Sequence, residues 1–103
     1  TSQIITQYEA LCSLTKPLDA TDCSHATLPD NLSKNRSKLI LPLNRTRPFL
    51  RGTFDDRTDY INAVFVNGFK HKDAYIITQM PLENTVVDLY RLLRDHQSHT
   101  VVM

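Results

Sequence analysis

Hydrophobic and polar positions follow a helical period at the start of the chain. In residues 3–14 the apolar side chains recur at a spacing that places them on one face of a helix. They are Ile4, Ile5, Tyr8, Leu11 and Cys12. Pro17 should end this helix, because proline lacks the amide donor that a helix interior needs. Residues 17–33 are rich in turn-forming side chains and predict loops with short turns.

The middle of the chain changes to a strand-like pattern. Residues 59–69 are rich in aromatic and β-branched side chains, which favour strands. Asn67-Gly68 is the dipeptide most typical of a hairpin turn, and Lys70 to Asp73 would lengthen that turn. Residues 74–79 then supply the return strand. The pattern therefore predicts a β-hairpin.

The last part of the chain predicts a helix followed by a strand. Thr85 and Asp88 have the spacing of a capping box, so the helix should begin there and run to about Gln97. Its apolar face is expected to consist of Val86, Val87, Leu89, Tyr90 and Leu93. Residues 99–103 predict a buried strand. Helix, loops, hairpin, helix and strand together predict an α/β fold built of packed layers.

Composition and charge bound the class of protein. The chain has 103 residues, of which 41% are hydrophobic and 22% charged, as expected for one globular domain. The formal net charge of +1 argues against a strongly basic nucleic-acid-binding domain. Between Lys34 and Arg57, however, seven basic residues stand against two acidic ones. We interpret that stretch as a solvated basic surface.

Cysteine usage and hydropathy indicate the compartment. Two cysteines are too few for the disulfide framework of a small secreted domain, so we expect both to be reduced and the chain to be cytosolic. The matches to the N-glycosylation pattern between residues 31 and 46 are then coincidental. No apolar run is long enough to insert directly into a membrane. The start without Met and the end on Val101-Val102-Met103 indicate a piece of a longer protein.

The residues alone reveal no complete catalytic or metal site. Cys12 is expected in the core, and His25, two residues after Cys23, is only a weak signal of a catalytic pair. With two glycines in the chain, no glycine-rich phosphate loop is predicted. His96 and His99 would supply two ligands at most, so we expect no metal and no cofactor, and interpret both as exposed.

Several short motifs, taken in order, resemble the amino-terminal half of a protein-tyrosine phosphatase domain. The motifs are Lys34-Asn35-Arg36, Leu41-Pro42, Asp59-Tyr60-Ile61-Asn62-Ala63, Ala74-Tyr75-Ile76 with Thr78-Gln79, Pro81-Leu82, and the helix bearing Asp88, Tyr90 and Arg91. The closing Thr100-Val101-Val102-Met103 looks like the next central strand of the family. The resemblance extends over about three-quarters of the chain, residues 28–103. It implies a partial phosphatase fold with a twisted mixed sheet flanked by helices. Residues 1–103 would be the amino-terminal part of a single domain, truncated before the catalytic loops.

The resemblance also implies site residues. The family uses a cysteine nucleophile, an arginine that holds the phosphate oxygens, and an aspartate that acts as general acid and protonates the leaving phenol. All three are expected beyond residue 103. The chain would therefore hold no catalytic residue, and whether it belongs to an active enzyme stays open. Structural family motifs would be formed by Asp59, Tyr60, Asn62, Ala63, Gln79 and Pro81.

A degenerate substrate-recognition loop follows from the same resemblance. It would contain Asn35, Arg36, Ser37 and Leu39. The family has a tyrosine at the position of Ser37, whose ring stacks on phosphotyrosine, and an aspartate at that of Leu39, which binds the substrate backbone. Serine has no ring to stack and leucine accepts no hydrogen bond. Met80 stands where active domains usually have glycine, and its side chain is expected to intrude there.

At Ser37, Leu39 and Met80 the chain departs from active phosphatase domains in a way that is similar to the membrane-distal second domain of receptor-type phosphatases. Short pieces of the chain look most like the subfamily whose ectodomains carry a MAM module. The first hypothesis is therefore a weakly active or inactive regulatory domain in the cytoplasm, within the intracellular part of a plasma-membrane receptor. Its partner would be a phosphotyrosine protein or the adjacent phosphatase domain.

Two further hypotheses differ in class. One is an active phosphatase that hydrolyses phosphotyrosine once the domain is complete. The other is a basic nucleic-acid-binding module that uses Lys34 to Arg57. That stretch lacks the glycine-and-aromatic signature of an RNA-recognition motif, so we expect no nucleic-acid partner.

Overall fold

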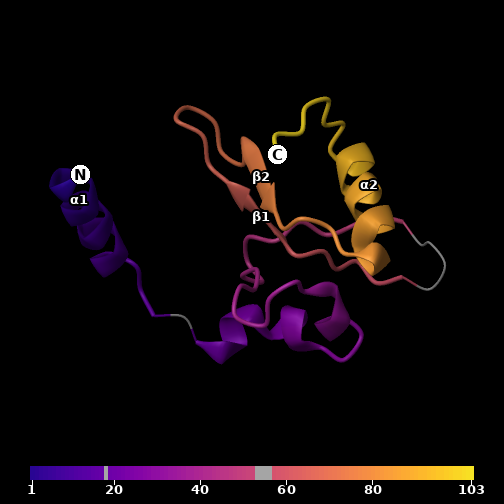
Figure 1. Ribbon diagram of the computed structural model, residues 1–103. Coiled ribbons are helices and arrows are strands. Elements are labelled where there is room, and N and C mark those ends of the chain that lie inside the picture. Colours follow the sequence, from indigo (N-terminus) through magenta and orange to yellow (C-terminus); the bar gives the residue numbers. More distant parts are fainter. Residues whose placement is uncertain (18, 53–56) are drawn as a thin grey trace.

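The computed structural model describes residues 1–17, 19–52 and 57–103, and Figure 1 shows how their elements are arranged. The α-helices are α1 (Ser2–Ser13) and α2 (Val86–Asp95), and the strands are β1 (Ala63–Val66) and β2 (Tyr75–Thr78). Short 3-10 helices are η1 (Ala20–Thr27), η2 (Leu32–Lys34) and η3 (Glu83–Thr85). In Figure 1, α1 lies apart from the other elements, whereas α2 lies beside the hairpin.

The predicted hairpin is confirmed. β1 and β2 pair antiparallel, with Ala63 opposite Thr78 and Val66 opposite Tyr75. The strands are shorter than the sequence pattern suggests, because the turn extends over residues 67–74. A backbone hydrogen bond from the Gly68 amide to the His71 carbonyl, 2.8 Å long, closes this tip. Among the described residues these two strands form the whole sheet, so no mixed sheet is present there.

The predicted loops between residues 17 and 33 contain more order than expected. A capping box starts η1: the Asp19 carboxylate accepts the Thr21 amide at 3.3 Å, and the Asp22 carboxylate accepts the Asp19 amide at 3.0 Å. The two aspartates thus satisfy backbone donors that a short helix leaves free. This segment ends at η2, immediately before the predicted recognition loop.

The helix α2 forms as predicted, but the face it buries is different. Its buried residues are Asp88, Arg91 and Leu92, whereas Val86, Val87 and Tyr90 are exposed. Leu92 joins the hydrophobic core, which consists of Leu50, Ile61, Ala63 and Leu92, with Ile76 and Leu89 packed against it. The periodicity of the apolar side chains alone did not reveal that a carboxylate and a guanidinium occupy the inner face.

A buried ion-pair network explains this orientation of α2. The Asp88 carboxylate, which has no exposed surface, accepts from Arg91 Nη1 at 3.1 Å and lies 3.4 Å from Arg57 Nη1. The prediction of a Thr85–Asp88 capping box is wrong, because Asp88 pairs with these cations. The Thr85 hydroxyl instead accepts the Leu82 amide at 2.8 Å. A buried carboxylate requires such cationic partners, so α2 turns Asp88 inward.

The predicted strand at residues 99–103 is absent. The segment is irregular, and the side chains of Val102 and Met103 are 91% and 100% exposed. Strand backbone groups need partners on a neighbouring strand. In the described part of the chain, β2 pairs with β1 alone, so residues 99–103 have no such partner.

The amino-terminal helix is confirmed in position but not in burial. α1 begins at Ser2 and ends at Ser13, close to the predicted bounds. None of its residues is buried, and Cys12 is exposed, so the expectation of a core cysteine is wrong. Helix formation depends on local sequence, whereas burial needs a surface that covers the helix.

Residues 1–103 alone should unfold without cooperativity, because many large apolar side chains remain exposed. They lie on α1, β2 and the carboxy-terminal segment, and include Ile4, Tyr8, Leu11, Ile77 and Val102. Urea unfolding of the purified 103-residue chain, followed in parallel by circular dichroism and tyrosine fluorescence, should give broad transitions that do not coincide. Coincident, steep transitions would contradict this expectation.

Candidate functional site

The predicted recognition loop, residues 34–40, is anchored through the side chain of Asn35. Its Nδ2 donates to the Ala26 carbonyl in η1 at 2.9 Å. Its Oδ1 accepts from the Tyr60 hydroxyl and from Asn62 Nδ2, the latter at 3.2 Å. Asn62 Nδ2 also donates to the Ile40 carbonyl at 3.0 Å. Asn35 and Asn62 thus fix both ends of the loop to the residues that lead into β1.

Arg36 and Gln79 join the loop to the chain after β2. The Arg36 amide donates to Gln79 Oε1 at 2.9 Å, and Gln79 Nε2 donates to the Lys34 carbonyl at 2.8 Å. The Arg36 guanidinium donates to the carbonyls of Met80 and Pro81, each at 3.0 Å. The side-chain amide of Gln79 therefore binds the backbone on either side of Asn35, at Lys34 and Arg36, and the guanidinium orders the Met80–Pro81 backbone.

Lys34, at the start of the loop, is buried instead of facing solvent. Its Nζ donates to Thr58 Oγ1 at 2.6 Å, and Thr58 Oγ1 donates to Asn31 Oδ1 at 2.9 Å. Burial lowers the pKa of Lys34, and the Asp88 charge opposes that shift. The sequence offered no specific signal for Thr58 or Asn31, because their role depends on contacts far along the chain.

Arg47 is buried as well, with 3% of its surface exposed. Its guanidinium lies 4.3 Å from the centre of the Phe49 ring, and Nη2 lies 3.6 Å from Asp59 Oδ1. The interpretation of residues 34–57 as a solvated basic surface is therefore wrong for Lys34 and Arg47. Asp55 and Asp56, which entered the charge count, lie outside the described residues.

Tyr60 forms the floor of the site, and its ring is fully buried. The hydroxyl donates to Asn35, and burial raises the pKa of Tyr60 to about 12. Ala63 follows at the start of β1, 1% exposed in the core. These residues hold the loop by packing and hydrogen bonds and offer no group to a ligand.

The residues that would face a substrate are different in character. The Ser37 hydroxyl accepts the Leu39 amide at 3.1 Å, so it is used within the loop itself. The Leu39 side chain is 93% exposed, Ile40 is 74% exposed and Met80 is 60% exposed. The structure thus brings together a firmly held loop backbone and an apolar, exposed rim.

Both cysteines of the chain are free. Cys12 is exposed on α1. Cys23 is buried, and burial, helped by the Asp22 charge, raises the pKa of its thiol. A raised pKa lowers the thiolate fraction that nucleophilic attack requires.

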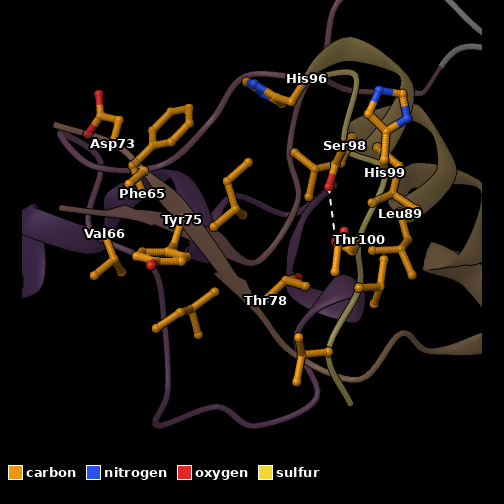
Figure 2. A pocket seen from close by; sticks show the side chains of 17 residues that line it. Phe65, Val66, Asp73, Tyr75, Thr78, Leu89, His96, Ser98, His99 and Thr100 are labelled. Carbon is orange, nitrogen blue, oxygen red and sulfur yellow. Dashed lines mark hydrogen bonds between the residues drawn. The ribbon is translucent and has the colours of Figure 1, made fainter. Parts of the chain in front are cut away.

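A groove of about 960 Å³ lies between β2, α2 and residues 98–102, as Figure 2 shows. Its walls are mostly apolar, with Leu89 and Val66 among the lining residues. His96 also lines it and packs edge-on against Phe65 at 5.4 Å, so the expectation of an exposed His96 is wrong. His99 is exposed, as expected.

The described ranges contain neither a cluster of metal ligands nor a helix that could span a membrane. Within residues 1–17, 19–52 and 57–103, no cluster of three or more His, Cys, Asp or Glu residues could hold a metal ion. Across the same ranges, no helix combines the length and the apolar character needed to cross a membrane.

The stability of the site should depend on pH through Tyr60. Its pKa of about 12 exceeds the ordinary value of 10.0, so the folded state keeps a proton that the unfolded state loses between these values. The contribution of Tyr60 to the free energy of unfolding is fully present below pH 10. It falls by about 1.4 kcal/mol per pH unit as the pH rises from 10 towards the folded-state pKa of about 12. Urea unfolding of the complete phosphatase domain between pH 9 and pH 12 should show this slope.

The Tyr60→Phe variant should lose that slope. Tyr90→Phe is the matched control, because Tyr90 is 68% exposed. An equal slope in the wild type and the Tyr60→Phe variant would contradict a buried, protonated Tyr60.

Comparison with known proteins identifies the family. The family model described as protein-tyrosine phosphatase matches residues 31–103. Receptor-type tyrosine-protein phosphatase U of Gallus gallus is 39% identical over 102 residues, which cover 99% of this chain and 7% of that relative. Human receptor-type tyrosine-protein phosphatase epsilon is 44% identical over 79 residues, covering 74% of this chain and 11% of the relative.

A solved structure supports the same assignment. It concerns the structural basis of the PTPN18 fingerprint on distinct HER2 tyrosine phosphorylation sites, and it is 37% identical with a TM-score of 0.68. The match covers 73% of this chain and 27% of the solved one, so the chain has a partial phosphatase fold. It also spans only a small share of the receptor-type relatives, 7% and 11%. The chain belongs to the protein-tyrosine phosphatase family, as a fragment of a phosphatase domain homologous to those of receptor-type members.

Proposed function

We propose that this chain forms the recognition side of a regulatory second domain of a receptor-type tyrosine phosphatase, with weak activity or none. The observation that carries the proposal is the contrast within residues 34–40. Asn35 and Arg36 hold the loop backbone through hydrogen bonds to η1, Tyr60 and residues 79–81. Ser37 and Leu39, at the positions that would contact a phosphotyrosine, lack the chemistry for that contact.

Ser37 weakens the expected pocket in two ways. A tyrosine ring at this position would stack on the substrate ring, a contact worth about 0.5–1.5 kcal/mol beyond burial of its area. The serine hydroxyl is too short to replace the ring as a wall, and it already accepts the Leu39 amide. A phosphotyrosine would therefore enter a shallower and less selective site.

Leu39 and Met80 change the rim of the same site. An aspartate at position 39 would accept hydrogen bonds from a peptide backbone, whereas the exposed leucine offers only apolar surface. Met80 lies directly beside the recognition loop, since its carbonyl accepts from Arg36, and its side chain is largely exposed. An apolar rim of this kind suits contact with another protein surface better than a charged phosphopeptide.

The partner class follows from this rim and from the relatives. The adjacent phosphatase domain of the same receptor is the partner we propose first, and a phosphotyrosine protein is the second. The proposed location is the cytoplasm, in the intracellular part of a plasma-membrane receptor of the MAM-bearing subfamily. Similarity to receptor-type phosphatases U and epsilon supports a receptor-type parent.

Chemistry in the complete domain would depend on residues outside this chain. The family transfers the phosphoryl group to a cysteine, and positioned donors stabilise the charge that develops. Of the residues described, Asn35, Arg36 and Gln79 would position the loop and Ser37 would face the substrate ring. The 103-residue chain by itself should hydrolyse nothing, since neither of its cysteines lies on a glycine-rich phosphate loop.

Restoring the lost contacts tests the proposal. In the complete phosphatase domain, the double variant Ser37→Tyr with Leu39→Asp should raise kcat/KM for a phosphotyrosine peptide by about tenfold, as about 1.4 kcal/mol of regained binding predicts. Leu14→Ala, which removes another largely exposed leucine, is the control and should leave kcat/KM unchanged.

The outcomes separate the two phosphatase hypotheses. A high wild-type rate that the double variant does not change would contradict the proposal and favour a fully active enzyme with a relaxed pocket. An undetectable rate in both proteins would exclude that alternative and leave a domain without activity.

A further inference from the structure

The tip of the β1–β2 hairpin, residues 67–74, presents an aromatic side chain that none of the described residues covers. Phe69 is 100% exposed, the highest exposure of any aromatic side chain among the described residues. Lys70, His71 and Lys72 follow it directly, and all three are exposed. In Figure 1 this tip projects beyond β1 and β2, away from α2.

The tip is held in this shape by specific contacts. The Gly68 amide donates to the His71 carbonyl at 2.8 Å, and the Asp73 amide donates to Asn67 Oδ1 at 3.0 Å. A Cβ on Gly68 would lie 2.9 Å from the Ala74 Cβ, so the chain crosses closely at this point. Asp73 has a positive φ of 51°, which lets the chain turn back into β2. These contacts order the turn that carries Phe69.

We propose that this tip docks onto an anionic membrane surface, with Phe69 entering the interfacial layer and Lys70 and Lys72 facing lipid headgroups. The inference rests on the proposed function, which places the chain in the intracellular part of a receptor. Aromatic side chains partition into the interfacial region, and each lysine near the cytoplasmic leaflet adds electrostatic attraction. Asp73 is the acidic side chain within the tip and lies at its base.

The small surface of the hairpin tip favours a membrane over a protein as the partner. A stable protein interface buries about 800 Å² on each side, far more than a hairpin tip with one apolar side chain can supply. Insertion into a membrane needs no complementary surface. The contact would be weak on its own, but a domain already tethered to the membrane meets it at high effective concentration. A weak contact of this kind is sufficient to orient the domain.

Vesicle binding tests the proposal. The complete phosphatase domain, separated from any membrane span, is sedimented with phosphatidylcholine vesicles that contain about one-third phosphatidylserine, and with pure phosphatidylcholine vesicles. We expect binding to the anionic vesicles that weakens as salt shortens the Debye length from about 10 Å at 0.1 M to about 3 Å at 1 M. Phe69→Ala should lower the partition coefficient by about tenfold or more.

Charge variants and a matched control complete the test. Lys70→Gln with Lys72→Gln should lower binding by about fivefold for each lysine. Leu14→Ala with Lys16→Gln removes the same kinds of exposed side chain elsewhere and should leave binding unchanged. Circular dichroism verifies that each variant is folded.

Absence of binding to anionic vesicles would overturn the proposal. Vesicle binding that the Phe69→Ala variant leaves unchanged would overturn it too, as would an equal loss of binding in the control variant. Capture of a protein through Phe69 without vesicle binding would also overturn it, in favour of a protein partner. Phosphotyrosine-peptide binding, measured on the same samples, reports the proposed function separately, so failure of one inference is distinguishable from failure of the other.

Discussion

The side chain of Asn35 connects three segments that lie far apart in the sequence. It donates to η1 at Ala26 and accepts from Tyr60 and Asn62, which lead into β1. These bonds fix the loop to η1 and to the residues that lead into β1, while Arg36 and Gln79 fix it to the chain after β2. Because an unpaired amide shielded from water loses hydration without compensation, every partner in this network is constrained by the others. The geometry of the candidate site therefore depends first on the partly buried side chain of Asn35.

The anchors of the loop and its proposed contacts are separate sets of residues. The anchors, Asn35, Arg36 and Gln79, form hydrogen bonds to protein groups and hold the loop backbone. The Ser37 hydroxyl accepts the Leu39 amide within the loop, and the Leu39 side chain is exposed. Loss of the contacts need not disturb the anchors, since no hydrogen bond of the network passes through the Leu39 side chain. A phosphatase domain can for this reason keep its shape after its recognition chemistry has weakened, which is what a regulatory role requires.

The local sequence correctly predicted those elements that form through interactions between residues close together in the chain. α1, α2 and the hairpin follow from periodicity and from Asn67-Gly68. The buried face of α2 did not, because the partners of Asp88 include Arg57, distant in the chain. The strand expected at residues 99–103 failed for a similar reason, since strand pairing depends on a neighbour that the local pattern does not specify.

The candidate site shows the same division. The family resemblance located the loop and the motif around Tyr60, whereas charge counting misplaced Lys34 and Arg47 on the surface. Their burial depends on Thr58, Phe49 and Asp59, which no spacing rule connects to them. Sequence therefore described the electrostatics of the candidate site poorly, and the assignment of its residues stays a prediction.

We propose that the loop keeps its anchors and has lost its affinity for phosphotyrosine. Titration calorimetry with a phosphotyrosine peptide on the complete phosphatase domain measures that affinity. The wild type should bind at least about tenfold more weakly than the Ser37→Tyr, Leu39→Asp variant, since about 1.4 kcal/mol corresponds to that ratio. Equal dissociation constants for the two proteins would contradict it.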